Sequence, residues 1–181
     1  MEEAGSINAA DVDHPPGRPV DDPATFLHRA VGLLTHVGHQ AHMIQYADMA
    51  KKLRILFVCV ENACRSQMAE AFARYYGGDR VEAASAGSRP RGQVDPQAIA
   101  VMKEQGIDLG GHTSKGLSTL PSDLWDVVVG MGCGEDCAVV PATRRITWQI
   151  PDPAHQPTSV YRQVRDLIDG AVKTLVERLI G

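Results

Sequence analysis

An apolar strand that leads into a helix through a short loop is the feature that most constrains the fold of this chain. The run Ile55 to Val58 predicts a strand. The run Gln67 to Tyr76 predicts a helix, because it has strong helix formers with apolar residues on one face. Cys59 follows the strand directly, so it stands just before the N-terminus of that helix. The unpaired N–H groups and the dipole at this end of a helix favour a bound anion.

The loop has the residue types of a nucleophilic cysteine site. Only a thiolate attacks, so such a site must stabilise a negative sulfur. The N–H groups of residues 60 to 65 can surround an anion, and Arg65 can clamp it with its planar, bidentate fork. The Ser66 hydroxyl can cap the helix or donate to the sulfur. A cysteine after a strand is more often a small core residue, but Arg65 and Ser66 at this spacing favour the nucleophile.

The rest of the chain alternates between strand and helix patterns. We expect further strands at Val81 to Ala84, Trp125 to Met131 and Arg144 to Ile150, and helices at Pro96 to Gln105 and Ser159 to Ile180. Strands separated by helices predict right-handed crossovers and a parallel sheet. Ligands of such sheets bind at the carboxyl ends of the strands, and Cys59 leaves the first strand at such an end.

Two more groups of polar residues follow predicted strands. Cys133 and Cys137 come after the third strand and can lie within disulfide reach if the local turn allows. Because both strands end at one edge of the sheet, Cys133 can approach Cys59. A structural zinc site made from all four cysteines is the alternative, but it leaves Arg65 without a role. Asp152, in the sequence Pro-Asp-Pro after the fourth strand, can supply a proton to a leaving group.

These motifs resemble a known family. Cys-x5-Arg-Ser directly after the first strand, with Asn62 in the loop and Gln-Met-Ala-Glu after it, is similar to the thioredoxin-coupled arsenate reductases of the low-molecular-weight protein tyrosine phosphatase superfamily, over residues 53 to 181. The resemblance implies an α/β fold with three layers, in which a four-stranded parallel sheet has helices on both faces.

The resemblance also implies roles for individual residues. Cys59 would attack arsenate, Asp152 would act as the general acid, and Asn62 would hold the shape of the loop. Cys133 and Cys137 would pass on a disulfide that external thioredoxin reduces, without a bound cofactor. Phosphate or sulfate would compete with arsenate for the loop, whose residues are Val60, Glu61, Asn62, Ala63, Cys64, Arg65 and Ser66. The implied biological role is arsenical resistance by detoxification.

Some positions differ from the family pattern or have no role in it. Glu61 stands where many members have glycine, so we expect its carboxylate to point to solvent. Cys64 has no counterpart in the relay and is interpreted as a spectator. Potassium binds near the loop asparagine in some members, which would place it here at Asn62, Glu70 and Ser85; we expect no other metal.

Two rival functions use the same loop. A tyrosine phosphatase would hydrolyse a cysteinyl-phosphate intermediate, but Gln67 and Ala154 stand where such phosphatases have proline and often an aromatic residue. It would also have no use for Cys133 and Cys137. A thiol redox sensor without enzymatic activity would keep the cysteines but would not need Arg65 or Asp152.

Composition is that of an ordinary globular enzyme. The chain of 181 residues is 44% hydrophobic with a net charge of −4, which argues against a dedicated nucleic-acid binder. It contains neither a long apolar run nor a secretory signal, so we expect a cytoplasmic protein without a membrane segment. In a reducing compartment, the four cysteines are more often catalytic or metal-binding than structural.

The N-terminal part of the chain is predicted to precede the enzyme domain. Residues 1 to 23 are acidic and rich in proline, so we expect a disordered tail. Residues 24 to 52 have a helical pattern with one apolar face, which must cover either the enzyme domain or a second copy of the chain in a homodimer. His36, His39 and His42 lie on this segment, but their spacing winds around the helix and favours a solvated or packed face over a metal site.

Overall fold

The computed structural model describes residues 51–134 and 139–181. The expected tail, the three histidines and nearly all of the expected helix at residues 24 to 52 lie outside these residues. Lys51 and Lys52, at the end of that expected helix, are described and are not helical. They lead directly into the first strand.

Four parallel strands form the sheet, in the order β2-β1-β3-β4. They are β1 (Leu53–Cys59), β2 (Val81–Gly87), β3 (Trp125–Met131) and β4 (Ala142–Thr147). The first strand, β1, lies inside the sheet, with β2 on one side of it and β3 and then β4 on the other. The carboxyl end of β1 is therefore flanked by the ends of β2 and β3, where Cys59 pairs with Gly87 and with Met131.

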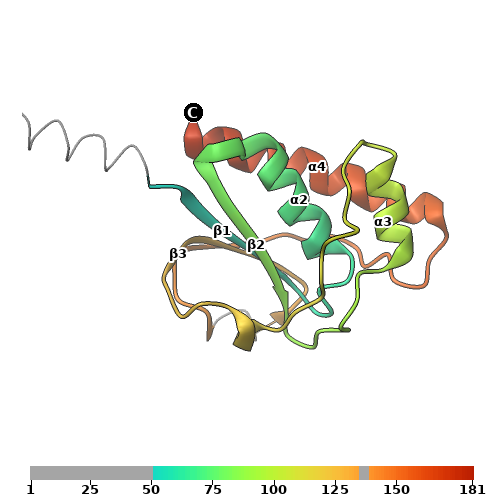
Figure 1. Cartoon of the computed structure of the whole chain (residues 1–181), viewed down its shortest axis with the longest axis horizontal. Coiled ribbons are helices and arrows are strands. Elements are labelled where there is room, and N and C mark those ends of the chain that lie inside the picture. Colours follow the sequence, from blue (N-terminus) through green and yellow to red (C-terminus); the bar gives the residue numbers. More distant parts are fainter. Residues whose placement is uncertain (1–50, 135–138) are drawn as a thin grey trace, which may run out of the picture. The chain divides into compact units, whose positions relative to one another are not determined.

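Helices cover one face of the sheet. They are α2 (Arg65–Gly77), α3 (Pro96–Lys103) and α4 (Thr158–Ile180), and Figure 1 shows α2 and α4 packed side by side above the strands. Alternate strand residues such as Phe57 and Val129 belong to this main core, because successive side chains of a strand point to opposite faces. The 3₁₀ helix η1 (Gly78–Arg80) joins α2 to β2.

A smaller core lies on the other face of the sheet. It contains Leu56, Val128 and Cys133, with Leu117 of the 3₁₀ helix η2 (Leu117–Thr119) packed against it. The expected three-layer α/β fold with a four-stranded parallel sheet is confirmed. Among the described residues, the layer on this second face is the thinner one and contains η2 rather than an α-helix.

Several element boundaries differ from the predicted ones, the end of the fourth strand and the start of the first described helix among them. The fourth strand was expected at Arg144 to Ile150, but β4 ends at Thr147, because its partner β3 ends at Met131. Gly132 then turns into a left-handed conformation, with φ of 77°, and the last ladder bond runs from the N–H of Trp148 to the Gly130 carbonyl. Helix α2 begins at Arg65, two residues before the expected start at Gln67. Among the described residues, no helix is long and apolar enough to cross a membrane.

An ion-pair cluster joins α3 to α4, and its stability should depend on pH. Glu104 accepts hydrogen bonds from Arg162 and from Arg165 at 2.7–3.0 Å. The bonds from Arg162 are the main cause that lowers the pKa of Glu104 to about 2, although burial opposes the shift. A carboxyl group whose pKa is lower in the folded protein stabilises the fold at pH values above its unfolded pKa of 4.5. That contribution is lost as the pH falls from about 4.5 toward 2.

We therefore expect Glu104→Gln to lower the free energy of unfolding near neutral pH and to make no difference in strong acid. Denaturant unfolding of both proteins across this pH range measures the change. Asp79→Asn, which removes an exposed carboxylate, is the charge-matched control. A constant difference between wild type and Glu104→Gln at every pH would contradict this account.

Candidate functional site

The loop between β1 and α2 is held from outside by the segment that follows β2. The carbonyl oxygens of Cys59, Val60 and Glu61 accept hydrogen bonds from the N–H groups of residues 88, 89 and 91, at 2.8–3.3 Å. The Ala63 carbonyl accepts from the N–H of Asp95 at 3.0 Å. Because these carbonyls are turned toward that segment, the N–H groups of residues 60 to 65 donate to no other described residue. They are available to an anion in front of Cys59.

This packing requires a glycine at the end of β2. A Cβ atom at Gly87 would lie 2.7 Å from the carbonyl oxygen of Val60 and 2.9 Å from the nitrogen of Asn62. Both are backbone atoms and cannot rotate away, so any other residue would push the loop out of place. Gly87 was not singled out from the sequence, because a glycine at a strand end has no distinctive local pattern.

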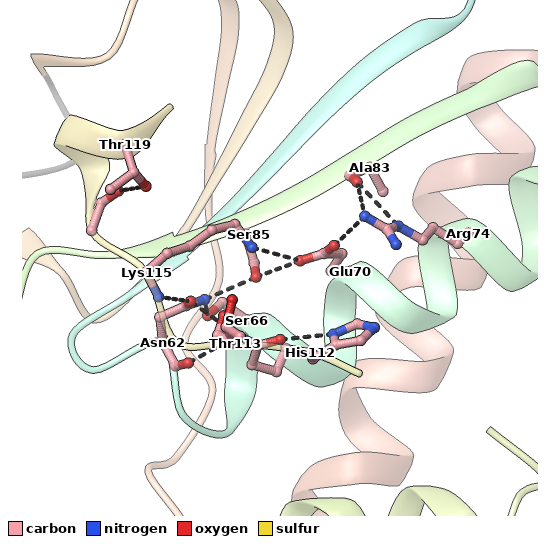
Figure 2. A network of polar contacts seen from close by, with 12 residues as sticks. Asn62, Ser66, Glu70, Arg74, Ala83, Ser85, His112, Thr113, Lys115 and Thr119 are labelled. Atoms are coloured by element: carbon pink, nitrogen blue, oxygen red, sulfur yellow. Dashed lines mark hydrogen bonds and ion pairs between the residues drawn. The ribbon is translucent and has the colours of Figure 1, made fainter. Parts of the chain in front are cut away.

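A chain of oriented hydrogen bonds leads to Cys59, and Figure 2 shows the part of it that joins Lys115, Asn62 and Ser66. The N–H of Lys115 donates to Asn62 Oδ1 at 2.8 Å, which fixes the orientation of the amide. Asn62 Nδ2 therefore donates to Ser66 Oγ, also at 2.8 Å. Ser66 Oγ lies 3.0 Å from Cys59 Sγ, and because it already accepts from Asn62, its own hydrogen is directed to the sulfur. The Ser66 hydroxyl thus offers the Cys59 sulfur a hydrogen bond.

The backbone of Asn62 also depends on its residue type. Its φ is 50°, in the left-handed region that asparagine tolerates better than most residues. Its side chain is fully buried and donates a second bond, to Ser85 Oγ at 2.8 Å. Asn62 thus sets both the turn of the loop and the orientation of the Ser66 hydroxyl beside Cys59.

The three residues suggested for potassium lie together, but their surroundings are already cationic. Ser85 Oγ accepts from Asn62 and donates to Glu70 Oε2 at 2.5 Å. The Glu70 carboxylate forms ion pairs with Arg74 and, at 3.7 Å, with Lys115 Nζ. Two positive side chains thus compensate this single carboxylate, so the residues do not fit a bound potassium ion. Among residues 51–134 and 139–181, no group of three or more His, Cys, Asp or Glu side chains could hold a metal ion.

Gln67 and His112, which received no role in the sequence analysis, extend this hydrogen-bond network away from Cys59. Gln67 Nε2 donates to Asn62 Oδ1 at 2.9 Å, and Gln67 Oε1 lies 2.8 Å from His112 Nδ1, which must be the donor. Burial is the main cause that lowers the pKa of His112, while the Glu70 carboxylate opposes the shift. The neutral imidazole thus keeps a proton on Nδ1. His112 is far from Gln67 in sequence, and no local pattern linked them.

Arg65 and Asp152 meet at the mouth of the loop. Their side chains form an ion pair, and Arg65 Nη1 also donates to the carbonyl of Ile150 at 3.3 Å. The Arg65 side chain is 6% exposed and that of Asp152 is 48% exposed, so the carboxylate covers the guanidinium from the solvent side. An incoming oxyanion would therefore compete with Asp152 for Arg65. The narrow pocket at this point is lined by Cys59, Glu61, Ala63, Cys64, Arg65 and Asp152.

The Glu61 side chain points outward, as expected. It is 45% exposed and lies 3.9 Å from Arg91 Nη1, which also pairs with Asp95. Its carboxylate therefore has a positive partner on the outer side of the loop, away from the oriented bonds behind Cys59.

Cys133 lies next to β1, the strand that ends at Cys59. Its sulfur is 3.7 Å from the carbonyl oxygen of Val58, and the neighbouring Gly132 is so close to Arg65 that an added Cβ would be 3.1 Å from Nη1. Cys133 is in a disulfide and 7% exposed, whereas Cys59 and Cys64 are free thiols. Cys137 lies outside the described residues. The structure thus brings Cys133 to the edge of the sheet that carries Cys59.

Cys64 should react far more slowly than Cys59. Burial, with a further contribution from the Asp95 carboxylate, raises the pKa of the Cys64 thiol to about 12. The thiol therefore stays protonated and unreactive near neutral pH. We expect brief iodoacetamide treatment of the fully reduced protein to alkylate Cys59 and leave Cys64 unmodified, as peptide mass spectrometry would show. Equal labelling, or complete loss of turnover in Cys64→Ser, would contradict the spectator role.

The comparisons with known proteins agree with this geometry. Residues 54–180 match the family model for low molecular weight phosphotyrosine protein phosphatase. The "Glutaredoxin arsenate reductase" of Synechocystis sp. is 42% identical over 71% of this chain and 96% of its own length. "Arsenate reductase 1" of Bacillus cereus is 41% identical over 71% of this chain and 98% of its own length.

The fold is also similar to that of a solved structure described as an arsenate reductase in the phosphate binding state. Its TM-score is 0.63 at 36% identity, and the match covers 71% of this chain and 98% of that one. The match to the family model spans the sheet, the loop after Cys59 and the helices described above. The chain therefore belongs to the low molecular weight phosphotyrosine protein phosphatase family.

Proposed function

We propose that this protein is an arsenate reductase that uses Cys59 as its nucleophile and Cys133 and Cys137 as a disulfide relay. The position of Cys133 is the main support for this proposal. Its sulfur is 3.7 Å from the carbonyl of the residue before Cys59, and a hydrolase with the same loop would have no use for a second sulfur there. The relatives named as arsenate reductases, which match along nearly their whole length, support the same activity.

In the first step, arsenate displaces the Asp152 carboxylate from Arg65 and binds the loop N–H groups. The displaced Asp152 carboxylate takes up a proton from the incoming hydrogen arsenate or from water. The Cys59 thiolate then attacks arsenic(V), and Asp152 gives this proton to the oxygen that leaves as water. The bond to the sulfur replaces one arsenic–oxygen bond. The product is a covalent thiol-arsenate adduct on Cys59.

The second step reduces the arsenic. Cys133 attacks the sulfur of Cys59, and the electron pair of the sulfur–arsenic bond goes to arsenic, which leaves as arsenite. Cys137 then attacks Cys133, frees the Cys59 thiolate and takes over the disulfide. One arsenate and two thiols thus become one arsenite, one disulfide and one water.

An external reductant must reset the disulfide. Thioredoxin is the proposed partner, because an intramolecular cysteine pair presents a protein disulfide for exchange. The Synechocystis relative is named for glutaredoxin, so glutaredoxin is the alternative. Arsenate turnover by the purified protein with thioredoxin and with glutaredoxin distinguishes the two partners.

A single-turnover experiment tests the relay. Fully reduced wild type, mixed with arsenate and no external thiol, should release one equivalent of arsenite. Cys137→Ser should do the same but retain a Cys59–Cys133 disulfide, whereas Cys133→Ser should release none. Arsenite release by Cys133→Ser without added thiol would refute the relay. Hydrolysis of para-nitrophenyl phosphate that far exceeds arsenate turnover would instead establish the phosphatase.

A further inference from the structure

The buried side-chain amide of Gln67 is fixed in one orientation. Gln67 lies in the first turn of α2 and is fully buried. Its Nε2 donates to the Asn62 carbonyl at 3.0 Å, to Asn62 Oδ1 at 2.9 Å and to the Thr113 carbonyl at 3.0 Å. These three oxygens can only accept hydrogen bonds, so the nitrogen of the amide must face them and its oxygen must face away.

This amide completes a row of fixed carbonyls along the loop. The carbonyls of residues 59 to 61 and of residue 63 accept from N–H groups of the segment that follows β2. The Asn62 carbonyl, which lies between them in the row, accepts instead from Gln67 Nε2. Asn62 is also the loop residue with the left-handed φ of 50°. Gln67 therefore fixes both the backbone and the side chain of Asn62.

His112 holds the other end of the Gln67 amide. Its Nδ1 lies 2.8 Å from Gln67 Oε1, which can only accept, so the ring donates. His112 is half-buried and belongs, with Thr113, to the segment that passes beside Asn62 (Figure 2). The charged neighbours of the ring are Glu70, Arg74, Lys115 and Asp108. Nδ1 carries a hydrogen in the charged ring and in the neutral tautomer that this contact favours, so the contact persists when the ring titrates.

The orientation of Asn62 decides where the Ser66 hydrogen points. Asn62 Oδ1 accepts from Gln67 Nε2 and from a backbone N–H. Its Nδ2 is therefore turned toward Ser66 Oγ and donates to it at 2.8 Å. Ser66 Oγ has one hydrogen and is left to donate it to Cys59 Sγ at 3.0 Å. A continuous chain of hydrogen bonds thus connects His112 to the Cys59 sulfur.

We propose that Gln67 and His112 are positioning residues for the reaction at Cys59. They hold the Asn62 amide so that the Ser66 hydroxyl stays directed at the sulfur, which keeps the sulfur in place for attack. Neither Gln67 nor His112 lines the pocket in front of Cys59, so both act through this chain and not by contact with the oxyanion. The proposal rests on the proposed function, because it concerns the nucleophile of that reaction.

Single turnovers of the fully reduced, full-length chain with saturating arsenate test the proposal. His112→Phe keeps a flat ring but removes the donor, so arsenite formation should slow by about 3- to 10-fold, the effect of one lost hydrogen bond. His112→Asn places an amide nitrogen near the position of Nδ1 and should restore the wild-type rate. Gln67→Met, which has nearly the same length and no donor, should be at least as slow as His112→Phe.

Combined variants show whether these effects pass through Ser66. In a Ser66→Ala background, His112→Phe should cause no further loss, because the hydroxyl that the chain orients is absent. The double variant of Gln67→Met and His112→Phe should be no slower than Gln67→Met alone. A structural defect would instead add to the loss in each background. Equal slowing by His112→Phe with and without the Ser66 hydroxyl, or failure of His112→Asn to restore the rate, would overturn the proposal.

Gln97→Met is the matched control. Gln97 also joins two segments through its amide, because its Nε2 donates to the Gln156 carbonyl and its Oε1 accepts from Thr158 Oγ1. Both partners lie at or just before the start of α4, away from the loop after Cys59. Gln97→Met should therefore form arsenite as fast as wild type.

Alkylation of Cys59 separates this proposal from the arsenate chemistry. Iodoacetamide reacts with reduced Cys59 without arsenate, and peptide mass spectrometry follows that residue alone. The His112 and Gln67 variants should be alkylated more slowly, in the same order as they release arsenite. That order of alkylation without arsenite release in wild type would refute the proposed function alone. Normal arsenite release at equal rates in wild type, His112→Phe and Gln67→Met would reject the positioning proposal alone.

Discussion

Asp152→Asn is expected to lower the rate of arsenite formation by about 10²- to 10⁴-fold, the usual contribution of a positioned general acid. Asparagine has nearly the same shape but cannot give a proton to the departing oxygen. Because the Asp152 carboxylate pairs with Arg65 in the structure, its removal also frees the guanidinium for anions. Phosphate should therefore inhibit the variant at lower concentration than wild type. Rapid-quench single turnovers and phosphate competition measure the two effects.

Asp79→Asn, on the surface, removes the same charge and should change neither quantity. Asp152→Asn should slow arsenite formation but strengthen phosphate binding, and this combination distinguishes a catalytic effect from a folding defect. A damaged site would lose both rate and phosphate binding. A variant that binds phosphate more weakly and reduces arsenate normally would show that Asp152 acts as a structural anchor for Arg65 rather than as the acid.

Asn62→Ala should have the largest effect on stability. The substitution leaves the buried Ser66 and Ser85 hydroxyls and the partly buried N–H of Lys115 without the amide that joins them. It also places an alanine at φ of 50°. We expect a loss of about 3–5 kcal/mol in the free energy of unfolding, measured by denaturant titration. Arsenite formation should fall as well, because Ser66 loses the bond that directs its hydrogen to Cys59.

Asn62→Gly separates the two causes. Glycine adopts the left-handed conformation without strain, so the backbone of the loop can persist while the side-chain network is lost. Its arsenite formation should be as slow as that of Asn62→Ala. Full activity in Asn62→Gly would mean that the loop's turn matters and that the oriented hydrogen bonds do not.

Local patterns were sufficient for most of the fold. The apolar runs that predicted the strands and the periodicity that predicted α4 depend only on neighbouring residues. The errors arose where a partner decides the boundary. Residues 148 to 150 look like a strand, but β3 ends at Met131, and the N–H of Trp148 makes the last hydrogen bond to it, at the Gly130 carbonyl. A strand's length therefore depends on a segment that its own sequence does not describe.

The candidate site also combines residues that local spacing predicts with residues that only the fold brings together. Cys59, Arg65 and Ser66 lie within one strand–loop–helix unit, so their spacing alone indicated an anion beside a thiolate. Gln67 and His112 were not recognised as partners, because their contact depends on how the loop before η2 folds back on α2. The potassium suggestion followed from the family resemblance, and only the structure showed Arg74 and Lys115 on the Glu70 carboxylate.

The sequence by itself thus determined the order of strands and helices and the position of a cysteine before a helix N-terminus, because hydrophobic periodicity and helix ends act between near neighbours. Only the tertiary structure decided that Gly132 lies against Arg65 and that Arg145 shares a cavity with Cys133. These contacts follow from the order and register of parallel strands. Hydrogen bonds between segments far apart in the chain set that register, and no local pattern specifies it.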